Sequence, residues 1–248
     1  MHLQNKSNSS PRHQDLLWCQ WFAGIVDSDG CLLLSPKGYG SLEITMSIND
    51  EYALQQIKKR LGGSIKIRSK AKAYRYRLHD KAGILQALNC LNGNIRNSVR
   101  EVQLKKLCNH YAIVYLQPSE LTLDSAWFSG FFDGDGTIGF SFKKGWPQLI
   151  ISVSNKKAID LGFFQSCFGG YIRLDKRSNT HKWELYKKED LLFFYTYLKK
   201  HPAKSFKQKR VRLIPTFFKL RSLRAYAQKD TLAYKNWVYF ERQWFALS

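Results

Sequence analysis

Hydrophobic and polar residues alternate along residues 41–48 of the chain. The apolar positions are Leu42, Ile44, Met46 and Ile48, and the polar positions are Ser41, Glu43, Thr45 and Ser47. A period of two residues is typical of a β-strand that buries one face and leaves the other in water. The apolar segment 31–35 lies just before the turn residues 37–40, so the two segments predict a β-hairpin.

Helical and strand patterns continue through both halves of the chain. The first half predicts a helix at 15–26, hairpin strands at 31–35 and 41–48, a helix at 51–61, strands at 64–69 and 73–79, and helices at 81–115. The second half predicts a helix ending at Asp133, strands at 137–142 and 148–154, a helix at 158–168, strands at 171–175 and 182–186, and further helices. Each half therefore has the order αββαββα.

Two ten-residue segments indicate a tandem duplication. Residues 21–30 read WFAGIVDSDG and residues 127–136 read WFSGFFDGDG, with six of ten positions identical. Further along, LGGSIKI at 61–67 matches FGGYIRL at 168–174 at nearly the same spacing. Several matches in register predict two related repeats rather than one chance similarity.

The predicted fold class is α+β, with two pseudo-symmetric repeats that pack through the motif helices, each with helices on one face of a four-stranded antiparallel sheet. The predicted divisions are a flexible tail at 1–14, a first repeat at 15–116, a linker at 117–123, a second repeat at 124–224, and a basic, aromatic extension at 225–248. Aromatic residues in the extension could stack on nucleotides. Packing of a helix onto the body is the favoured interpretation.

The charge balance points to a polyanionic partner. The 248 residues include 40 Lys and Arg against 19 Asp and Glu, which gives a net charge of +21. Such self-repulsion is tolerated most easily by a protein that works against nucleic acid or an anionic membrane. No run of about 18 apolar residues is present to span a membrane. Nucleic acid is therefore the favoured partner, and no membrane is expected.

The cysteines favour a reducing compartment. They are Cys19, Cys31, Cys90, Cys108 and Cys167. An odd, scattered set without a C-x-x-C pair predicts buried thiols rather than a disulfide framework or a zinc site. We therefore expect an intracellular protein that is not secreted.

The polar faces of the predicted strands are the candidate nucleic-acid surface, because strands can present Lys, Arg, Gln and Asn to phosphates and base edges. The candidates in the first half are Glu43, Thr45, Ser47, Lys66, Arg68, Lys70, Arg75 and Arg77. Those in the second half are Lys143, Gln148, Ser152, Ser154, Arg173 and Lys182. The same basic bias in two sheets predicts a surface that follows a phosphate backbone.

Each motif ends its helix with Asp-x-Asp-Gly. A carboxylate at a helix C-terminus meets the negative end of the dipole and unpaired carbonyl groups, so a cation is expected there. Asp29 and Asp135, with the carbonyl groups of Ser28 and Gly134, form an oxygen ligand set suited to Mg²⁺. Metal beside a phosphate-binding surface favours hydrolysis of phosphodiesters. The first acids of the two motifs are expected only to end the helices.

The two motifs resemble the signature of the LAGLIDADG homing endonucleases, and the duplicated layout over about 15–224 matches the single-chain, two-repeat members of that family. The resemblance implies a pseudo-twofold monomer in which the motif helices form the contact between repeats. It implies two sheets that hold a long double-stranded DNA site. It also implies that Asp29 and Asp135 bind divalent metal, with the carbonyl groups of Ser28 and Gly134 beside them.

Family members also place a basic residue after the last strand of each repeat, near the scissile phosphates. Lys207 and Arg96 are the corresponding candidates, and their charge could stabilise the phosphate or order the attacking water. A polar residue at the end of the second strand often holds water in this family. Asn155 fits that place, and Ile48 is its expected partner in the first repeat, so the DNA strands could be cut unequally.

These expectations describe a site-specific endonuclease that cuts both strands of a long DNA target. The resemblance implies Mg²⁺ as cofactor, Mn²⁺ as an alternative, and Ca²⁺ as an ion that supports binding without cleavage. An RNA maturase that assists its host intron, or a DNA-binding regulator that does not cut, are the other two functions left open. An intron-encoded protein of this kind is expected in a mitochondrion or chloroplast.

Overall fold

The computed structural model describes residues 11–246. The first repeat contains α1 (Pro11–Asp29), β1 (Gly30–Leu34), β2 (Gly40–Ser47), α2 (Glu51–Leu61), β3 (Ser64–Ile67), β4 (Ala73–Leu78), α3 (Lys81–Leu91) and α4 (Ser98–His110). The second contains α5 (Trp127–Asp135), β5 (Gly136–Lys143), β6 (Trp146–Asn155), α6 (Gly162–Phe168), β7 (Tyr171–Asp175), β8 (Thr180–Leu185), α7 (Lys188–Lys200), α8 (Lys207–Arg212) and α9 (Ile214–Ser222). The helix α10 (Leu232–Phe245) follows them.

The predicted tail at 1–14 is wrong at its inner boundary. Residues 1–10 lie outside the described residues, but α1 already begins at Pro11. Proline suits the first turn of a helix because its missing N–H has no partner there in any case. The first motif helix is therefore four residues longer at its start than the hydrophobic pattern predicts.

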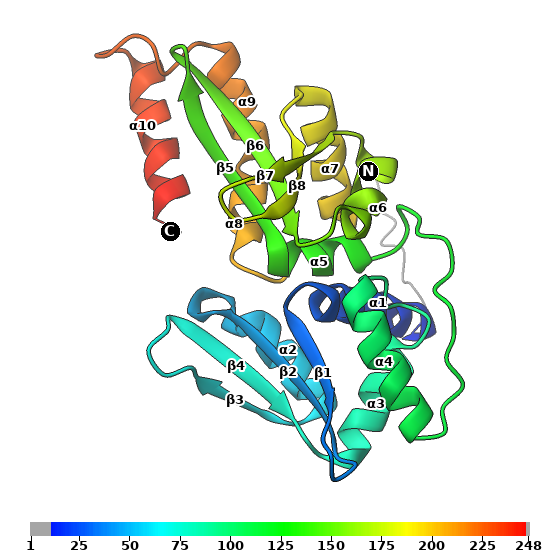
Figure 1. Cartoon of the computed structure of the whole chain (residues 1–248). Coiled ribbons are helices and arrows are strands. Elements are labelled where there is room, and N and C mark those ends of the chain that lie inside the picture. Colours follow the sequence, from blue (N-terminus) through cyan, green and yellow to red (C-terminus); the bar gives the residue numbers. More distant parts are fainter. Residues whose placement is uncertain (1–10, 247–248) are drawn as a thin grey trace, which may run out of the picture.

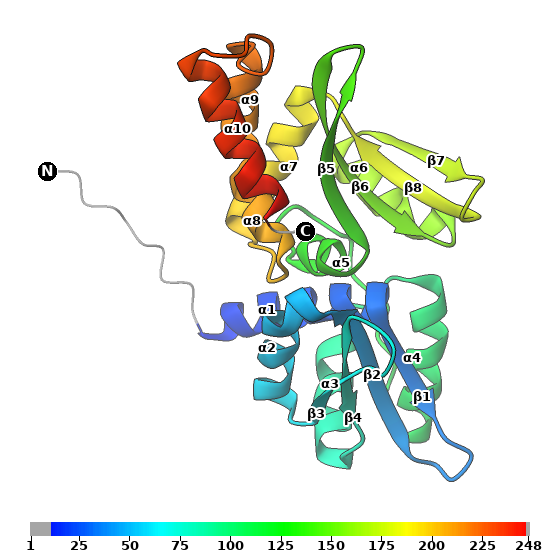
Figure 2. The same cartoon turned by 90° about the vertical axis from the view of Figure 1, so that its left-hand side faces the viewer.

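Each repeat contains one antiparallel sheet with the same strand order. The orders are β1-β2-β4-β3 and β5-β6-β8-β7, so the two sheets have equivalent topology. In Figure 1 the first repeat lies below and the second above, with α1 and α5 between them. Figure 2 shows strands of both repeats toward the right, and α2, α9, α10 and the start of α1 toward the left. The predicted α+β class with two pseudo-symmetric repeats is confirmed.

The strands have the predicted two-residue period. Leu42, Ile44 and Met46 of β2 are buried, and the positions between them are partly exposed. Leu149, Ile151 and Val153 of β6 follow the same pattern. Burial of one face under helices leaves the other face of each sheet free for a partner.

The motif helices α1 and α5 approach one another closely at two glycines. A Cβ atom on Gly24 would lie 2.2 Å from the carbonyl oxygen of Trp127, and one on Gly130 would lie 1.9 Å from that of Trp21. Any side chain would therefore push the two backbones apart, which explains why glycine is present at both positions.

The register of the hairpins corrects the expected partner of Asn155. Gly30 pairs with Ile44 in the first sheet, whereas Gly136 pairs with Val153 in the second. The second hairpin is thus three residues longer when counted from the motif, and Met46 rather than Ile48 occupies the position equivalent to Asn155. Met46 is buried, so the first repeat still has no polar side chain at this place.

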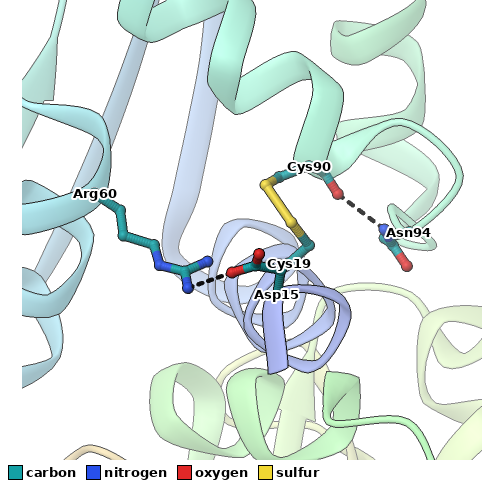
Figure 3. The surroundings of a disulfide bond; sticks show 5 residues. All are labelled: Asp15, Cys19, Arg60, Cys90 and Asn94. Atoms are coloured by element: carbon teal, nitrogen blue, oxygen red, sulfur yellow. Dashed lines mark hydrogen bonds and ion pairs between the residues drawn. A yellow bond between two sulfur atoms is a disulfide. The ribbon is translucent and has the colours of Figure 1, made fainter. Parts of the chain in front are cut away.

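One pair of cysteines contradicts the expectation of unpaired thiols. Cys19 of α1 and Cys90 of α3 form a disulfide, with their Cα atoms 4.8 Å apart (Figure 3). The two residues are 71 positions apart in sequence and become neighbours because α3 packs beside α1. Spacing in the sequence therefore gave no indication of the pair.

The helix α10 packs by aromatic residues onto the second repeat. Trp237, Phe240 and Trp244 are buried. Their rings lie 5.4–5.7 Å from the ring of Phe140 on β5. The favoured interpretation of the extension, helix packing, is confirmed for these three residues. No helix within residues 11–246 has the length and apolar character needed to cross a bilayer.

Candidate functional site

The motif helices end side by side, so one acid from each repeat reaches the same place. A Cβ atom on Gly134 would lie 2.0 Å from Ser28 Oγ and 3.0 Å from Asp29 Oδ2, which shows how near the end of α5 is to the end of α1. Burial raises the pKa of Asp29 to about 6. Burial and then the charge of Asp29 raise the pKa of Asp135 to about 7. We call Asp29 and Asp135 the acid pair.

The acid pair fits a divalent cation by its chemistry. Two half-buried carboxylates that repel one another ionise more readily when a positive charge lies nearby. No group of three or more His, Cys, Asp and Glu side chains surrounds a metal position within residues 11–246. Mg²⁺ commonly takes only one or two carboxylates and completes its shell with water and substrate phosphate oxygens. The residues present are therefore compatible with Mg²⁺ when a phosphate is bound.

Lys207 occupies the C-terminal end of α5. Its Nζ donates hydrogen bonds to the carbonyl oxygens of Phe132 at 3.0 Å, Asp133 at 2.7 Å and Gly134 at 2.6 Å. Burial lowers the pKa of Lys207, and nearby carboxylates oppose that shift. The ammonium group thus supplies the cation expected at this helix end. It also engages the Gly134 carbonyl, which the sequence suggested as a metal ligand.

The first acids of the motifs bind the opposite repeat. Trp127 Nε1 donates a 2.8 Å hydrogen bond to Asp27, and Trp21 Nε1 donates one of the same length to Asp133. Asp27 also accepts from the Arg96 backbone N–H. Burial raises the pKa of Asp27 to about 7, and these hydrogen bonds oppose the shift. Both acids therefore hold the repeats and the following loops together.

A second acid from each repeat contacts the other repeat, and the sequence motifs did not indicate it. Asp50 accepts a 2.8 Å hydrogen bond from the Phe206 backbone N–H, and Asp160 accepts one of 2.9 Å from that of Ser98. These contacts fix the starts of α8 and α4, which carry the basic residues discussed next. The only available signal was an Asp at a similar distance after the second strand of each repeat.

The structure separates Arg96 from the acid pair. Its guanidinium lies 5.9 Å from the ring centroid of Phe163, and only its backbone contacts Asp27. The charge of Arg100, like that of Lys207, instead opposes the rise in pKa of both members of the acid pair. Its Nε is buried without a hydrogen-bond partner in the described part of the chain. Arg100 is therefore a candidate that the sequence analysis missed.

The sequence held no direct signal for Arg100, because the loops that follow the two sheets align only through their hydrogen bonds to the first acids. Asp27 accepts from the N–H of Arg96, and Asp133 accepts from that of Lys204. Counting three residues onward from each loop places Val99 opposite Lys207, and Arg100 directly after it. The two repeats thus provide their basic residues from different positions.

Arg100 and Asn155 share a pocket of about 470 Å³ that also includes Ser28 and Asp135. Asn155 Oδ1 accepts a 3.3 Å hydrogen bond from the Lys157 N–H at the end of β6. A pocket with a carboxylate, an arginine and an amide can hold a phosphate and a water next to it. This is the place where the sequence candidates Asn155, Asp135 and Ser28 meet.

On the polar face of each sheet, basic side chains form ion pairs with acidic side chains of the same sheet. Arg77 Nε lies 2.8 Å from Glu43, and Arg75 lies 3.7 Å from the same carboxylate. Arg173 and Lys182 pair with Glu184 and Asp175, each at 2.7 Å. Partners of this kind orient the basic groups before any ligand arrives.

The other sheet candidates are not in such pairs among the described residues; the four basic ones are exposed and the five others are half-buried. These are Thr45, Ser47, Lys66, Arg68, Lys70, Lys143, Gln148, Ser152 and Ser154. Arg68 and Lys70 lie beyond β3, which ends at Ile67 rather than at the predicted residue 69. They therefore belong to the turn between β3 and β4 and not to the flat face.

Fold and site together define the class: a tandem-repeat α+β protein with a half-buried acid pair where the two repeats meet and with a polar, partly basic face on each sheet. The sequence model of the LAGLIDADG endonuclease family matches residues 22–111 and 128–220, one match for each repeat. The chain belongs to this family.

The names of similar proteins describe two kinds of activity. The intron-encoded RNA maturase bI4 of Saccharomyces cerevisiae is 46% identical over 230 residues, which cover 91% of this chain and 36% of that protein. The intron-encoded DNA endonuclease ai2a of Dictyostelium discoideum is 32% identical over 255 residues, which cover 99% of this chain and 82% of that protein. The chain thus spans 36% of the length of the yeast relative.

A solved structure shows the same fold at low sequence identity. I-SmaMI, bound to an uncleaved DNA target in the presence of calcium ions, has a TM-score of 0.61 and 13% identity. The likeness covers 90% of this chain and 97% of that chain.

Proposed function

We propose that this protein is a divalent-metal-dependent endonuclease that hydrolyses both strands of a specific double-stranded DNA site. The observation that carries the proposal is the acid pair, because each repeat contributes one half-buried carboxylate to the same place. Structural residues alone would not require two acids that repel one another at the contact between the repeats. Family membership and the DNA endonuclease relative support the same function.

The proposed mechanism assigns a role to each residue around the acid pair. Asp29, Asp135 and the Ser28 carbonyl would hold Mg²⁺, which supplies an activated water and neutralises charge on the phosphate when bound. Arg100 would contact a phosphate oxygen from the side of the 470 Å³ pocket. Asn155 would orient water in that pocket. The positive charge of Lys207 would offset the negative C-terminal end of the α5 dipole, so that the two acids ionise more easily.

The sheets would hold the DNA on both sides of this centre. Exposed lysines and arginines such as Lys66 and Lys143 would contact phosphates, and Gln148 and Ser152 would read base edges. Both acids come from one chain, so a monomer suffices for two cuts. We further propose expression from an organellar intron, in line with the intron-encoded relatives.

Cleavage of a randomised DNA library, or of the host gene with its intron removed, tests the proposal. The wild-type protein is expected to cut one defined site in Mg²⁺ or Mn²⁺, and to bind it without cutting in Ca²⁺. Asp135→Asn should lose cleavage but keep binding in Ca²⁺. Tight binding without cleavage in either Mg²⁺ or Mn²⁺ would overturn the nuclease proposal in favour of a regulator or a maturase.

RNA maturase activity is the second candidate, because the relative with 46% identity carries that name. Splicing of the host intron with purified protein would test it. Intron splicing that survives Asp135→Asn would show an RNA function that is separate from the acid pair. Splicing that proceeds equally well without the protein would exclude that function.

A further inference from the structure

A pocket of about 310 Å³ lies where the two repeats meet near the start of α1. Leu17, Trp18 and Trp21 of α1 form its apolar part. Arg60 of α2 reaches it from the first repeat, and Lys200 and Lys204 reach it from the second. We call this site the seam pocket. The start of α1 and α2 lie to the left in Figure 2, whereas strands of both sheets lie to the right.

The positive groups of the seam pocket sit directly on its aromatic rings. Lys204 Nζ lies 3.6 Å from the ring centroid of Trp21, and the Arg60 guanidinium lies 4.6 Å from that of Trp18. Figure 3 shows Arg60 reaching across to Asp15 on α1, with which it forms a 2.6 Å ion pair. Lys200 forms an ion pair with Asp124. Two of the three cations are thus already neutralised.

Lys204 differs from its neighbours. Its ammonium makes no hydrogen bond or ion pair with any residue that the structure describes; the Trp21 ring is its contact. Burial lowers the pKa of Lys204 to about 8, although Asp133 opposes that shift. Lys204 is half-buried and its ammonium keeps contact with water, so an anion that enters the pocket would meet a cation that has no oxygen partner from the described residues.

His201 adds a second unsatisfied group on the same wall. Only 5% of the surface of His201 remains accessible to solvent. Its Nε2 has no hydrogen-bond partner within residues 11–246. Because that nitrogen is enclosed, the group that the seam pocket offers to a ligand is the Lys204 ammonium, beside apolar residues.

We propose that the seam pocket binds one nucleotide of a single-stranded nucleic acid, with its phosphate on Lys204 and its base against the apolar wall. An anion alone would leave Leu17 and the rest of the apolar lining uncovered in a pocket of this volume. Aromatic and basic groups together are the usual partners of unpaired bases and their phosphates. A duplex keeps its bases stacked inside and cannot present one to this recess. The proposal is independent of DNA cleavage, because the pocket shares no residue with the acid pair.

A competition measurement tests the proposal. The probe is a fluorescein-labelled 12-mer of uridine, measured by anisotropy while saturating unlabelled duplex DNA occupies other basic surfaces. Lys204→Gln should raise the Kd of the probe on the order of tenfold, as expected for loss of one charge-assisted hydrogen bond. Lys229→Gln, at an exposed position after α9, is the matched control and should leave the Kd unchanged. Lys204→Arg should restore most of the binding.

A crosslinking measurement locates the ligand directly. A 12-mer that carries 4-thiouridine should crosslink to the peptide that contains Trp18 and Trp21, and Lys204→Gln should remove that product. Uridine monophosphate and a thymidine 12-mer are the competitors that identify the source. If the monophosphate competes at equal nucleotide concentration, the ligand of the seam pocket is a free nucleotide. If the thymidine 12-mer competes, the pocket accepts any single strand, DNA or RNA.

Two outcomes would overturn the proposal. One is a probe affinity that falls equally in Lys204→Gln and Lys229→Gln, since that would indicate general loss of charge. The other is crosslinking confined to the sheet residues. Melting temperature and DNA cleavage, measured on each variant, show that the protein is folded and keep the result separate from the nuclease proposal.

Discussion

Arg100 and Lys207 place positive charge near the acid pair in two different ways. Lys207 Nζ is saturated by three carbonyl oxygens, so its charge stabilises the end of α5. Arg100 donates a 3.3 Å hydrogen bond to Gln103 from NH1, and its Nε has no partner among the described residues. Of the two, Arg100 is the group with capacity left for a phosphate.

Replacement of Arg100 by glutamine should therefore slow cleavage without unfolding the protein. Loss of one preorganised group at a reacting phosphate costs about a hundredfold in rate. Single-turnover cleavage of plasmid DNA is the measurement. Arg96→Gln is the control, because its guanidinium lies over Phe163, away from the acid pair. A rate for Arg100→Gln equal to that of Arg96→Gln would contradict the assignment.

The raised pKa values of the acid pair predict how pH acts on stability. Their pKa values are about 6 and about 7 in the folded chain, against an ordinary value of 3.8. The folded state then holds protons that the unfolded state has lost, so metal-free protein should lose stability as pH rises from about 4 to about 7. Asp27 and Asp50 have raised pKa values as well and act in the same direction.

Metal should reverse that trend, since a cation binds the ionised carboxylates. The thermal stabilisation by Ca²⁺ should grow as pH rises from 5.5 to 8, and saturation at about 100 times Kd corresponds to about 2.7 kcal/mol. Melting curves with and without Ca²⁺ measure it, and Asp135→Asn should remove most of the effect. A Ca²⁺ shift of the same size at every pH would argue against the acid pair as the ligand.

The two acids of the acid pair could be predicted from the sequence, whereas Arg100 could not. Asp29 and Asp135 occur in two copies of one motif, and the chemistry of a helix C-terminus singles them out. Arg100 follows a loop that aligns only through its hydrogen bond to Asp27. Arg96, which is nearer in sequence, contributes its backbone instead of its side chain.

At the scale of elements, the close approach of α1 and α5 depends on glycine. Gly130→Ala would place a Cβ atom 1.9 Å from the Trp21 carbonyl oxygen, a backbone atom that cannot move aside easily. Overpacking of this kind should lower the free energy of unfolding by about 3 kcal/mol. Urea denaturation measures the change.

A glycine on the adjacent strand provides the comparison for Gly130→Ala. No atom lies within 4 Å of a Cβ built on Gly139 in β5, so Gly139→Ala should change the free energy of unfolding by less than about 1 kcal/mol. Equal destabilisation by both substitutions would show that glycine is not required by the helix contact.

The elements themselves follow from local patterns, and their relative placement does not. The two-residue period of β2 and the Gly-Gly end of α2 are visible in the sequence. The three-residue difference between the hairpins arises because β5 and β6 are longer than β1 and β2. The pairing of Cys19 with Cys90 depends on how α3 packs against α1. Both depend on tertiary contacts that no local pattern encodes.

At the scale of the whole molecule, four acids define the pseudo-twofold relation between the repeats. Asp27 binds Trp127 as Asp133 binds Trp21, and Asp160 binds Ser98 as Asp50 binds Phe206. All four bonds cross from one repeat to the other. These contacts between the repeats are therefore symmetric, whereas several residues beside the acid pair differ between the two halves.

Those departures predict that the two DNA strands are cut at different rates. Asn155 corresponds to the buried Met46, and Lys207 corresponds to Val99, so the water and charge around the acid pair differ between the halves. Loss of one oriented hydrogen bond is worth on the order of tenfold in rate. A target labelled with a different fluorophore on each strand should show one product forming first, with nicked DNA as an intermediate. Asn155→Ile should slow one DNA strand selectively, and Met46→Leu should slow neither. Equal slowing of both strands by Asn155→Ile would mean that the two cuts share one water site, and the asymmetry of the sheets would then have no consequence for the order of cleavage.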